Sequence, residues 1–321
     1  MLRPTCKITI GTLEFDFLNE LEIVSSWKNL TDTAVLRLPN KIKQGGKSIV
    51  SGADNLFKRG DEVKIVLGYY PETARVFTGF VAGITPDSPL VLQLEDHAYL
   101  FKQKSITASY KEVTLSNLLT DLCPIEFYSV DANLGAFRIS NANFAQVLAE
   151  LKKTYGLVSW VKEGILFCGL PYFPTTNPLD GLTHKLSFQR NIIESSLEYL
   201  REDDVKIKVK GVSILKDNSR IEIEAGDPEG AQRSLFYYGL DKENLKKIVN
   251  RELPKLKYKG YRGEFTTFGS PTIKHGDTVE LKDLKFSERE GEYFVDEVVT
   301  TQGLNGFRQK VTLGAKVRSI E

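Results

Sequence analysis

Histidine is the side chain most often used for acid–base chemistry and metal binding near neutral pH, and the chain has three of them. His97, His184 and His275 lie far apart, so a metal site would have to collect them from different parts of the chain. His97 follows Glu95 and Asp96, but strand alternation would place Asp96 on the opposite face. We therefore expect His97 to be a polar residue at a strand end, and we predict neither a metal site nor a cofactor site.

Other catalytic signatures are incomplete or absent. Gly46-Lys47-Ser48 matches the end of a phosphate-binding loop, but that motif needs a glycine where the chain has Lys41, and a helix directly after Ser48. The sequence contains no Gly-x-Ser-x-Gly motif, no His-Glu-x-x-His pair and no EF-hand loop. Aspartate and glutamate are too numerous for their spacing to identify an acid–base pair. A peptidoglycan hydrolase therefore stays an alternative function, supported only by the abundance of carboxylates. We expect no catalytic residue.

Aromatic residues near turns are the candidates for contacts with a partner or ligand. Such residues serve equally well in interfaces, in stacking and in core packing. The paired tyrosines favour a carbohydrate-binding or adhesin module as an alternative function. The candidate interface residues are Trp27, Tyr69, Tyr70, Tyr237 and Tyr238.

Composition describes an ordinary globular protein of 321 residues, 41% hydrophobic and 26% charged. The formal charge of +1 gives no overall attraction to nucleic acid or to an anionic membrane. No apolar run is long enough to span a bilayer, and the first residues lack a signal core. The three cysteines, Cys6, Cys123 and Cys168, are widely spaced, which favours reduced thiols and synthesis in the cytoplasm.

Two stretches of the chain look like copies of each other. Residues 23–27 match 193–197, residues 34–38 match 205–209, and residues 60–65 match 276–281. Asp61 and Asp277 each follow a glycine in the last match, where aspartate is usually a turn residue. We expect both halves to have one fold. A duplicated β unit favours assembly over catalysis, because two copies in one chain can act as neighbouring subunits of a ring.

Hydrophobic periodicity predicts a mostly β protein with an α+β insert. Residues 1–104 alternate with period two, as do residues 186–321, which indicates two barrels or sandwiches of the tube type. The last block also contains a helix from near Asp241, which Pro254 should kink or end early. Residues 169–181 are rich in proline and glycine and are interpreted as a linker.

The insert, residues 105–185, contains two helical patterns. Thr114 caps the first and Pro124 stops it, whereas Asn143 caps the second and Gly156 ends it. The apolar residues of the second pattern are spaced to form one stripe that faces a core. A hairpin is predicted over residues 157–168.

Several strings in these blocks resemble one known family. Residues 77–81 with 92–96 are similar to its strand pair before an inserted domain, and residues 291–298 with 306–314 to its closing strands. The family is the tail hub family of bacteriophages and related injection machines: the late control protein D group, the central hub of contractile-phage baseplates and the hub part of the type VI spike. The string most similar to its helix and hairpin is Phe144-x-x-Val147-Leu148-x-x-Leu151-x-x-x-Tyr155-Gly156-Leu157, then Trp160-Val161, Gly164, Leu166 and Gly169.

The resemblance implies a non-enzymatic homotrimer in which two barrels per subunit make a pseudo-sixfold ring. Such a ring would match a sixfold tail tube to a threefold spike, and each open strand edge would be paired by its neighbour. The implied partners are a tail tube protein, a spike or tip protein and other baseplate proteins, with no recognition of nucleic-acid sequence. The implied location is a virion tail or injection-particle baseplate, assembled in the bacterial cytoplasm. Spike and hydrolase functions would belong to other polypeptides.

Overall fold

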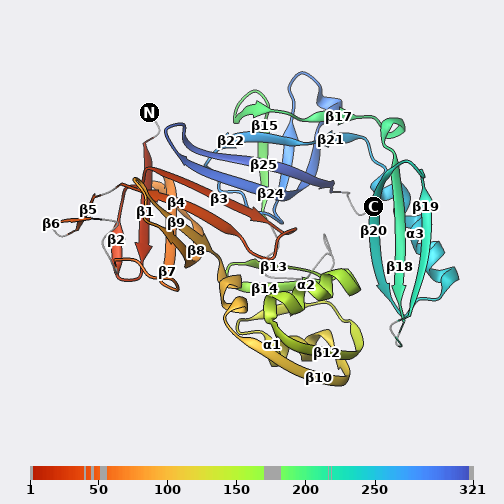
Figure 1. The fold of residues 1–321 in the computed structure, drawn as a ribbon. Coiled ribbons are helices and arrows are strands. Elements are labelled where there is room, and N and C mark those ends of the chain that lie inside the picture. The colour runs from red at the N-terminus through yellow and green to blue at the C-terminus, as the bar shows by residue number, and fades with distance from the viewer. Residues whose placement is uncertain are drawn as a thin grey trace.

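The computed structural model describes residues 3–39, 41–44, 47–50, 56–169, 182–215, 217 and 219–317. Strands dominate it, and the helices are few (Figure 1). This confirms the predicted fold class, mostly β with a small helical insert. A 13-stranded sheet runs through both ends of the chain. No helix within the described residues is long and apolar enough to cross a membrane.

The first unit of this sheet comes from the N-terminal part of the chain. Its strand order is β3-β4-β9-β8-β7-β1, with β2 beyond β1. Leucine, isoleucine and valine alternate along each strand and bury one face. The bounds are β1 Pro4–Ile10, β2 Leu13–Phe15, β3 Glu20–Ser26, β4 Thr33–Leu38, β7 Glu62–Tyr69, β8 Glu72–Thr85 and β9 Leu90–Glu95. Lys47 and Ser48 lie in a separate hairpin of β5 Lys41–Gln44 and β6 Lys47–Val50, where a phosphate-binding motif would require a helix.

The second unit repeats this topology. Its order in the sheet is β16-β22-β25-β24-β23-β15. Strands that come at the same point along the chain of each unit therefore occupy the same place in the sheet, if β2 is left aside. One pairing differs, because β15 is parallel to β23 whereas β1 is antiparallel to β7. The bounds are β15 Thr183–Ser187, β16 Ile192–Ser195, β22 Glu264–Phe268, β23 Thr278–Lys282, β24 Gly291–Gly303 and β25 Gly306–Lys316.

The glycine–aspartate turns confirm the third sequence match. In the first unit the backbone N–H of Lys58 donates to Asp61 Oδ2 at 2.8 Å, and in the second the N–H of Lys274 donates to Asp277 Oδ2 at 2.9 Å. Each aspartate carbonyl then accepts the N–H of a valine on the following long strand, Val81 or Val295, at 2.9 Å in both cases. The two turns are thus built the same way.

The other two sequence matches are wrong in detail. β3 pairs with β4 in the first unit, but β16 pairs with β22, so β22 is the counterpart of β4. Residues 205–209 instead lead into β18, which belongs to a separate sheet. The match of 193–197 to 23–27 is out of register, because the strand pairings described below place residues 198–200, and not 194–196, at the positions of residues 24–26. Alternation marks a half-buried strand but does not specify its partner.

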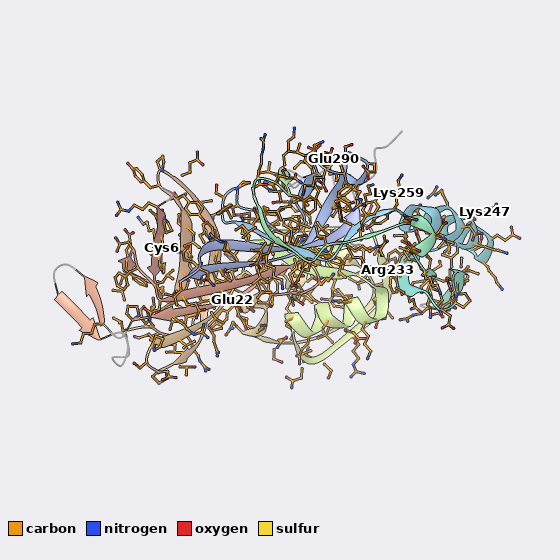
Figure 2. The ribbon with its side chains drawn as sticks, turned by 90° about the horizontal axis from the view of Figure 1, so that it is seen from above. Cys6, Glu22, Arg233, Lys247, Lys259 and Glu290 are labelled. Carbon is orange, nitrogen blue, oxygen red and sulfur yellow. The ribbon has the colours of Figure 1, made fainter. Side chains whose placement is uncertain are left out.

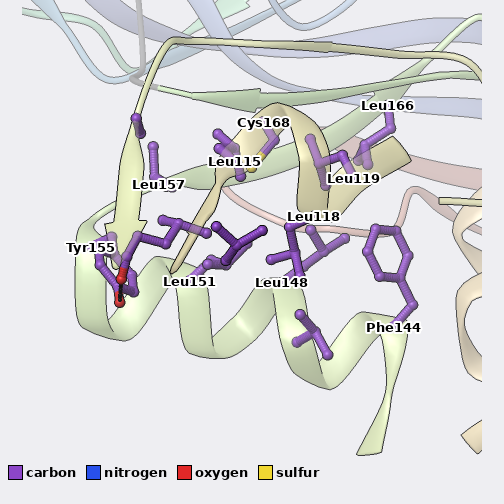
Figure 3. Close-up of a cluster of buried hydrophobic side chains, with 14 of the residues drawn as sticks. Leu115, Leu118, Leu119, Phe144, Leu148, Leu151, Tyr155, Leu157, Leu166 and Cys168 are labelled. Carbon is purple, nitrogen blue, oxygen red and sulfur yellow. Dashed lines mark hydrogen bonds between the residues drawn. The ribbon is translucent and has the colours of Figure 1, made fainter. Parts of the chain in front are cut away.

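The insert has the predicted elements. Its helices are α1 Leu115–Leu122, capped by Thr114, and α2 Phe144–Tyr155, which has a capping box of Asn143 and Gln146 and ends at Gly156. Figure 3 shows the apolar faces of both helices packed together, and burial of each large side chain contributes about 1.5–3 kcal/mol. The remaining elements are η1 His97–Lys102, β10 Ser105–Thr114, β11 Phe127–Ser129, β12 Asn133–Asn143, β13 Val158–Lys162 and β14 Ile165–Gly169.

Between β16 and β22 lies a further layer that the sequence did not separate. Helix α3 covers one face of the sheet β19-β18-β20 through Leu245 and Val249, while Phe236 on the other face joins the core of the insert. Charged side chains such as Lys247 extend outward from this layer (Figure 2). The helix continues past Pro254 to Leu256, so the proline does not end it early. The bounds are β17 Glu198–Leu200, η2 Glu202–Asp204, β18 Ile207–Ile214, β19 Arg220–Gly226, β20 Ala231–Tyr238, α3 Lys242–Leu256, β21 Gly260–Arg262 and, later, η3 Ser287–Arg289.

Contact between this layer and the insert depends on Gly156. Its φ is +68°, and an added Cβ would lie 2.1 Å from the Phe236 ring. Gly156→Ala is therefore expected to lower the free energy of unfolding by about 2–5 kcal/mol, combining backbone strain with overlap. Gly239→Ala is the matched control, because φ is +69° but nothing lies within 4 Å of the added Cβ. Urea unfolding of both variants measures the difference, and equal losses would show that the Phe236 contact is unimportant.

Candidate functional site

The two units meet in a strand pairing within the chain. Strand β3 of the first unit runs antiparallel to the second half of β24, from Ser26 opposite Glu297 to Leu21 opposite Gln302. Figure 1 shows β3 and β24 side by side where the sheet passes from one unit to the other. We call this ladder the seam. It makes one continuous sheet out of two units that are far apart in sequence.

A buried carboxylate fastens the seam. Asp296 sits at the bulge of β24, is 5% exposed, and accepts a hydrogen bond from Trp27 Nε1 at 2.9 Å. Lys28 Nζ lies 2.6 Å from its other oxygen, and Ser26 Oγ donates to its main-chain carbonyl at 3.2 Å. A bulge re-aims a side chain, which here turns Asp296 towards β3. The cation and the indole N–H offset the desolvation of the carboxylate.

A second polar cluster fastens the insert to the second unit. Asp277 accepts from His184 Nε2 at 3.0 Å and lies 3.3 Å from Lys162 Nζ, which comes from β13 of the insert. Burial alone would raise the pKa of Asp277, but the His184 hydrogen bond and the Lys162 charge lower it below its ordinary value. The charge partner of Lys162, a residue of the insert, therefore lies in the second unit.

The tip of the β13–β14 hairpin also reaches both units. Glu163 pairs with Arg75 on β8 at 2.5 Å and with Lys274 before β23. Burial raises the pKa of Glu163, but the two cations outweigh it and the pKa falls below its ordinary value. Glu163 and Gly164 both have positive φ, as a two-residue hairpin turn requires. This turn places the carboxylate between the units.

A cavity of about 200 Å³ lies where the first unit, the second unit and the insert meet. Burial raises the pKa of Asp32 to about 7, and burial with the nearby Asp32 charge raises that of Asp96 well above its ordinary value. Burial and the Lys162 charge lower the pKa of His275 to about 3. The cavity therefore favours uncharged groups. Its polar lining includes Ser25, Asp32, Asp96, His97, Lys274 and His275.

Ser25, His275 and Asp32 come together in this cavity, but not in the arrangement of a catalytic triad. Ser25 Oγ lies 2.6 Å from His275 Nδ1 and 2.5 Å from Asp32 Oδ2, so the hydroxyl bridges the other two groups. In a triad the histidine bonds serine and carboxylate through opposite ring nitrogens. Here His275 Nε2 is buried and has no hydrogen-bond partner among the described residues. This geometry does not activate a serine nucleophile.

Two of the three histidines lie near the turn that contains Asp277, and the third lies at the start of the insert. His184 and His275 lie on either side of the Asp277 turn, whereas His97 begins η1 and meets the Phe80 ring edge-on at 5.8 Å. In the part of the chain that the structure describes, no group of three His, Cys, Asp or Glu side chains is placed to hold a metal ion. Sequence reasoning missed Ser25 and Asp32, because their contact with His275 joins residues about 250 positions apart.

The five aromatic candidates lie in three separate places. Trp27 belongs to the seam, and Tyr69 is 8% exposed with its hydroxyl donating to the Phe307 carbonyl at 2.7 Å. Tyr237 packs partly buried beside α3, and Tyr238 donates to the Tyr155 carbonyl at 3.0 Å. Tyr70, at 76% exposure, is the widely exposed residue of the set. Four of the five therefore make contacts within the chain.

Comparisons with solved structures place the fold among tail proteins. The 43 kDa tail protein of prophage MuSo2 from Shewanella oneidensis is 16% identical, with a TM-score of 0.60 over 97% of this chain and 98% of its own. A tail protein from Neisseria meningitidis is also 16% identical, with a TM-score of 0.62 over 99% of this chain and 97% of its own.

A more distant structural match is a component of the E. coli type VI secretion system, described as similar to T4 bacteriophage tail proteins gp27 and gp5. It is 9% identical, with a TM-score of 0.56 over 97% of this chain and 77% of its own. No family profile and no curated sequence matches the chain. At such low identities the likeness establishes the fold, which is that of tail proteins from phage-like particles and of type VI components.

Proposed function

We propose that this chain is a structural, non-enzymatic hub of a tail or baseplate. In this proposal three copies form a ring that joins a tail tube to a tip or spike and lines the axial channel. The particle is a virion tail or a related injection device, assembled in the bacterial cytoplasm. The observation that carries the proposal is the pair of units with one strand order, fused into a continuous sheet by the seam.

Symmetry supports a ring. A head-to-tail contact closes into a ring or continues as a filament, depending on the rotation it imposes. The seam is such a contact, made between two copies of one unit inside a single chain. Three chains with two units each would match a sixfold partner on one side and a threefold partner on the other. The division into residues 1–104, 105–185 and 186–321 belongs to this proposal, with the middle part at the periphery.

The outer face of the continuous sheet suits the wall of a water-filled channel. Leu21 and Ile23 of β3 point into the core, whereas Glu22 between them is exposed. Figure 2 shows Glu22 on this strand, and the same alternation places Gln93 of β9 on the exposed face. On this face Val35 of β4 lies between Glu22 and Gln93, so the apolar side chain is flanked by polar ones. Tube, spike and other baseplate proteins would contact the two ends of the ring.

The site geometry favours a role without catalysis. Asp32, Asp277 and Glu163, whose pKa values are shifted, lie where the units and the insert meet, and each cluster described above joins two parts of the chain. Perturbed groups of this kind also occur in structural ion-pair networks. The hydroxyl of Ser25 is held between Asp32 and His275 and is not aligned for attack.

Oligomeric state is the direct test of the proposal. Light scattering and native mass spectrometry over rising protein concentration should show a trimer as the largest closed species. Binding to the cognate tail tube protein is the second measurement, because a weak ring can form on its partner alone. A chain that stays monomeric at high concentration and does not bind tube would contradict the proposal.

A further inference from the structure

Several strand edges stay open in the described part of the chain, among them the free edge at the end of β8 and the free edge of β16 and β17. Strand β8 pairs with β7 as far as Phe80 and with β9 through Thr85, so residues 83–85 have one edge without a partner strand. Strands β16 and β17 pair with β22 and β21 on one side, and no described strand lies on their other side. Open edges of this kind favour pairing with another chain.

The first open edge corresponds to the part of β24 that forms the seam. β8 has a bulge after Val81, and β24 has one after Val295. The N–H groups of these two valines bond to the carbonyls of the equivalent turn residues Asp61 and Asp277. Residues 83–85 therefore occupy the positions of residues 297–299, which pair with Ser26, Ser25 and Val24 in the seam.

The second open edge corresponds to β3. In the first unit Leu94 pairs with Val81 on one side and with Ala34 on the other. In the second unit Leu313 pairs with Val295 on one side, and on the other its N–H donates to the Gly263 carbonyl. Gly263 thus occupies the position in the second unit that Ala34 occupies in the first, and Arg262 occupies the position of Thr33. Because Thr33 pairs with Val24 and Arg262 with Glu198, residues 198–200 of β17 occupy the positions of residues 24–26.

We infer that residues 83–85 of one copy pair with β17 of a second copy, antiparallel and in the register of the seam. Thr85 then lies opposite Glu198, Ile84 opposite Tyr199, and Gly83 opposite Leu200. The occupant is a second copy of this chain, because the seam already shows this edge of the long strand accepting this edge of the repeated unit. The contact itself follows from the strand register, and its closure into a ring rests on the proposed function.

This contact between copies is weaker than the seam. The position of Asp296 is taken by Ala82, and those of Ser26 and Trp27 by Leu200 and Arg201, so the buried carboxylate with its donors is missing. Pro86 takes the position of Thr300 and lacks the N–H needed to continue the ladder. The contact between copies therefore consists of a short main-chain ladder, and association should depend strongly on protein concentration.

Cysteine cross-linking of the full chain tests the register. Thr85→Cys and Glu198→Cys, combined in one chain and oxidised, should give covalent oligomers, whereas a mixture of the two single variants should give covalent dimers only. The native thiols should contribute little, because burial raises the pKa of Cys6 and of Cys168 to about 11 and that of Cys123 above its ordinary value. The unsubstituted chain measures that background.

The matched control is Thr85→Cys with Glu194→Cys. Glu194 precedes Glu198 along the same open edge and is also exposed, but it lies about 13 Å further along the strand. That exceeds the Cα separation of about 7 Å that a disulfide tolerates. Cross-linking of the 85–198 pair well above the 85–194 pair supports the inference, and equal yields overturn it.

The two proposals fail differently. A trimer in light scattering without 85–198 cross-links would overturn this contact and leave the hub function standing. Cross-linked open chains with no closed trimer and no tube binding would support the contact and contradict the hub.

Ala82→Asp gives an independent measurement, since the new carboxylate would face Arg201 of the next copy. It should strengthen association about two- to fivefold, with Ala82→Asn as control, and no change between them would count against the contact.

Discussion

Replacing Asp277 with alanine is expected to lower the free energy of unfolding by about 3–5 kcal/mol. Asp277 is 5% exposed and is the charge partner of Lys162, whose side chain is 12% exposed. Without the carboxylate, the ammonium group stays buried and His184 loses its hydrogen bond. Urea unfolding followed by circular dichroism measures the loss.

Asp61→Ala is the matched control for that variant. Asp61 makes the same turn in the first unit and accepts the same bond from Lys58, but no cation within the described residues pairs with it. Its loss should cost about 0.5–1.5 kcal/mol, the range of one ordinary hydrogen bond. If both variants lost the same stability, Asp277 would be a turn residue and nothing more, and the insert would be held by its apolar contacts.

Asp32→Asn is expected to change how stability depends on pH. The folded pKa of Asp32 is raised to about 7 from an ordinary value near 4, so between these values the folded chain binds one more proton than the unfolded chain. Stability due to this group is present below about pH 4 and is lost as pH rises through about 7. From about pH 5 to about pH 8 the loss is about 2–3 kcal/mol, and the variant should not show it.

Other groups in the cavity modify the measured profile. Asp96 is shifted in the same direction and remains in the variant, so some loss with rising pH should persist. His275 acts oppositely, because its pKa is lowered to about 3 and its contribution is lost as pH falls below about 6.5. The difference between variant and wild type at each pH isolates Asp32. A difference that stays constant from about pH 5 to about pH 8 would show that Asp32 ionises normally in the folded chain.

Local patterns predicted much of the fold. The caps at Thr114 and Asn143 and the stop at Gly156 were found from the sequence, because each depends on residues within one helical turn. The glycine–aspartate turns were found for the same reason. Helix α3 was predicted, but its end was not, since Pro254 lies in the last turn, where few further backbone bonds can be lost.

Long-range pairing was not predictable from those patterns. Residues 205–209 alternate as a counterpart of β4 would, yet they lead into β18 of another sheet, and β22 takes that place. The long insertion between β16 and β22 hides this from any comparison of neighbouring strings. Trp27, proposed as an interface residue, makes its contact with Asp296 inside the chain. Whether Tyr70 contacts a partner stays a prediction.

By itself the sequence determined the mostly β class, the helices of the insert and a duplicated unit, because these depend on periodicity and on neighbours a few residues apart. The tertiary structure alone decided which strands pair across the seam and which polar groups meet where the units join. Ser25 and His275, or Trp27 and Asp296, come together only after the sheet has set its register. That register is a property of the folded chain, because a strand's alternation is compatible with many partners.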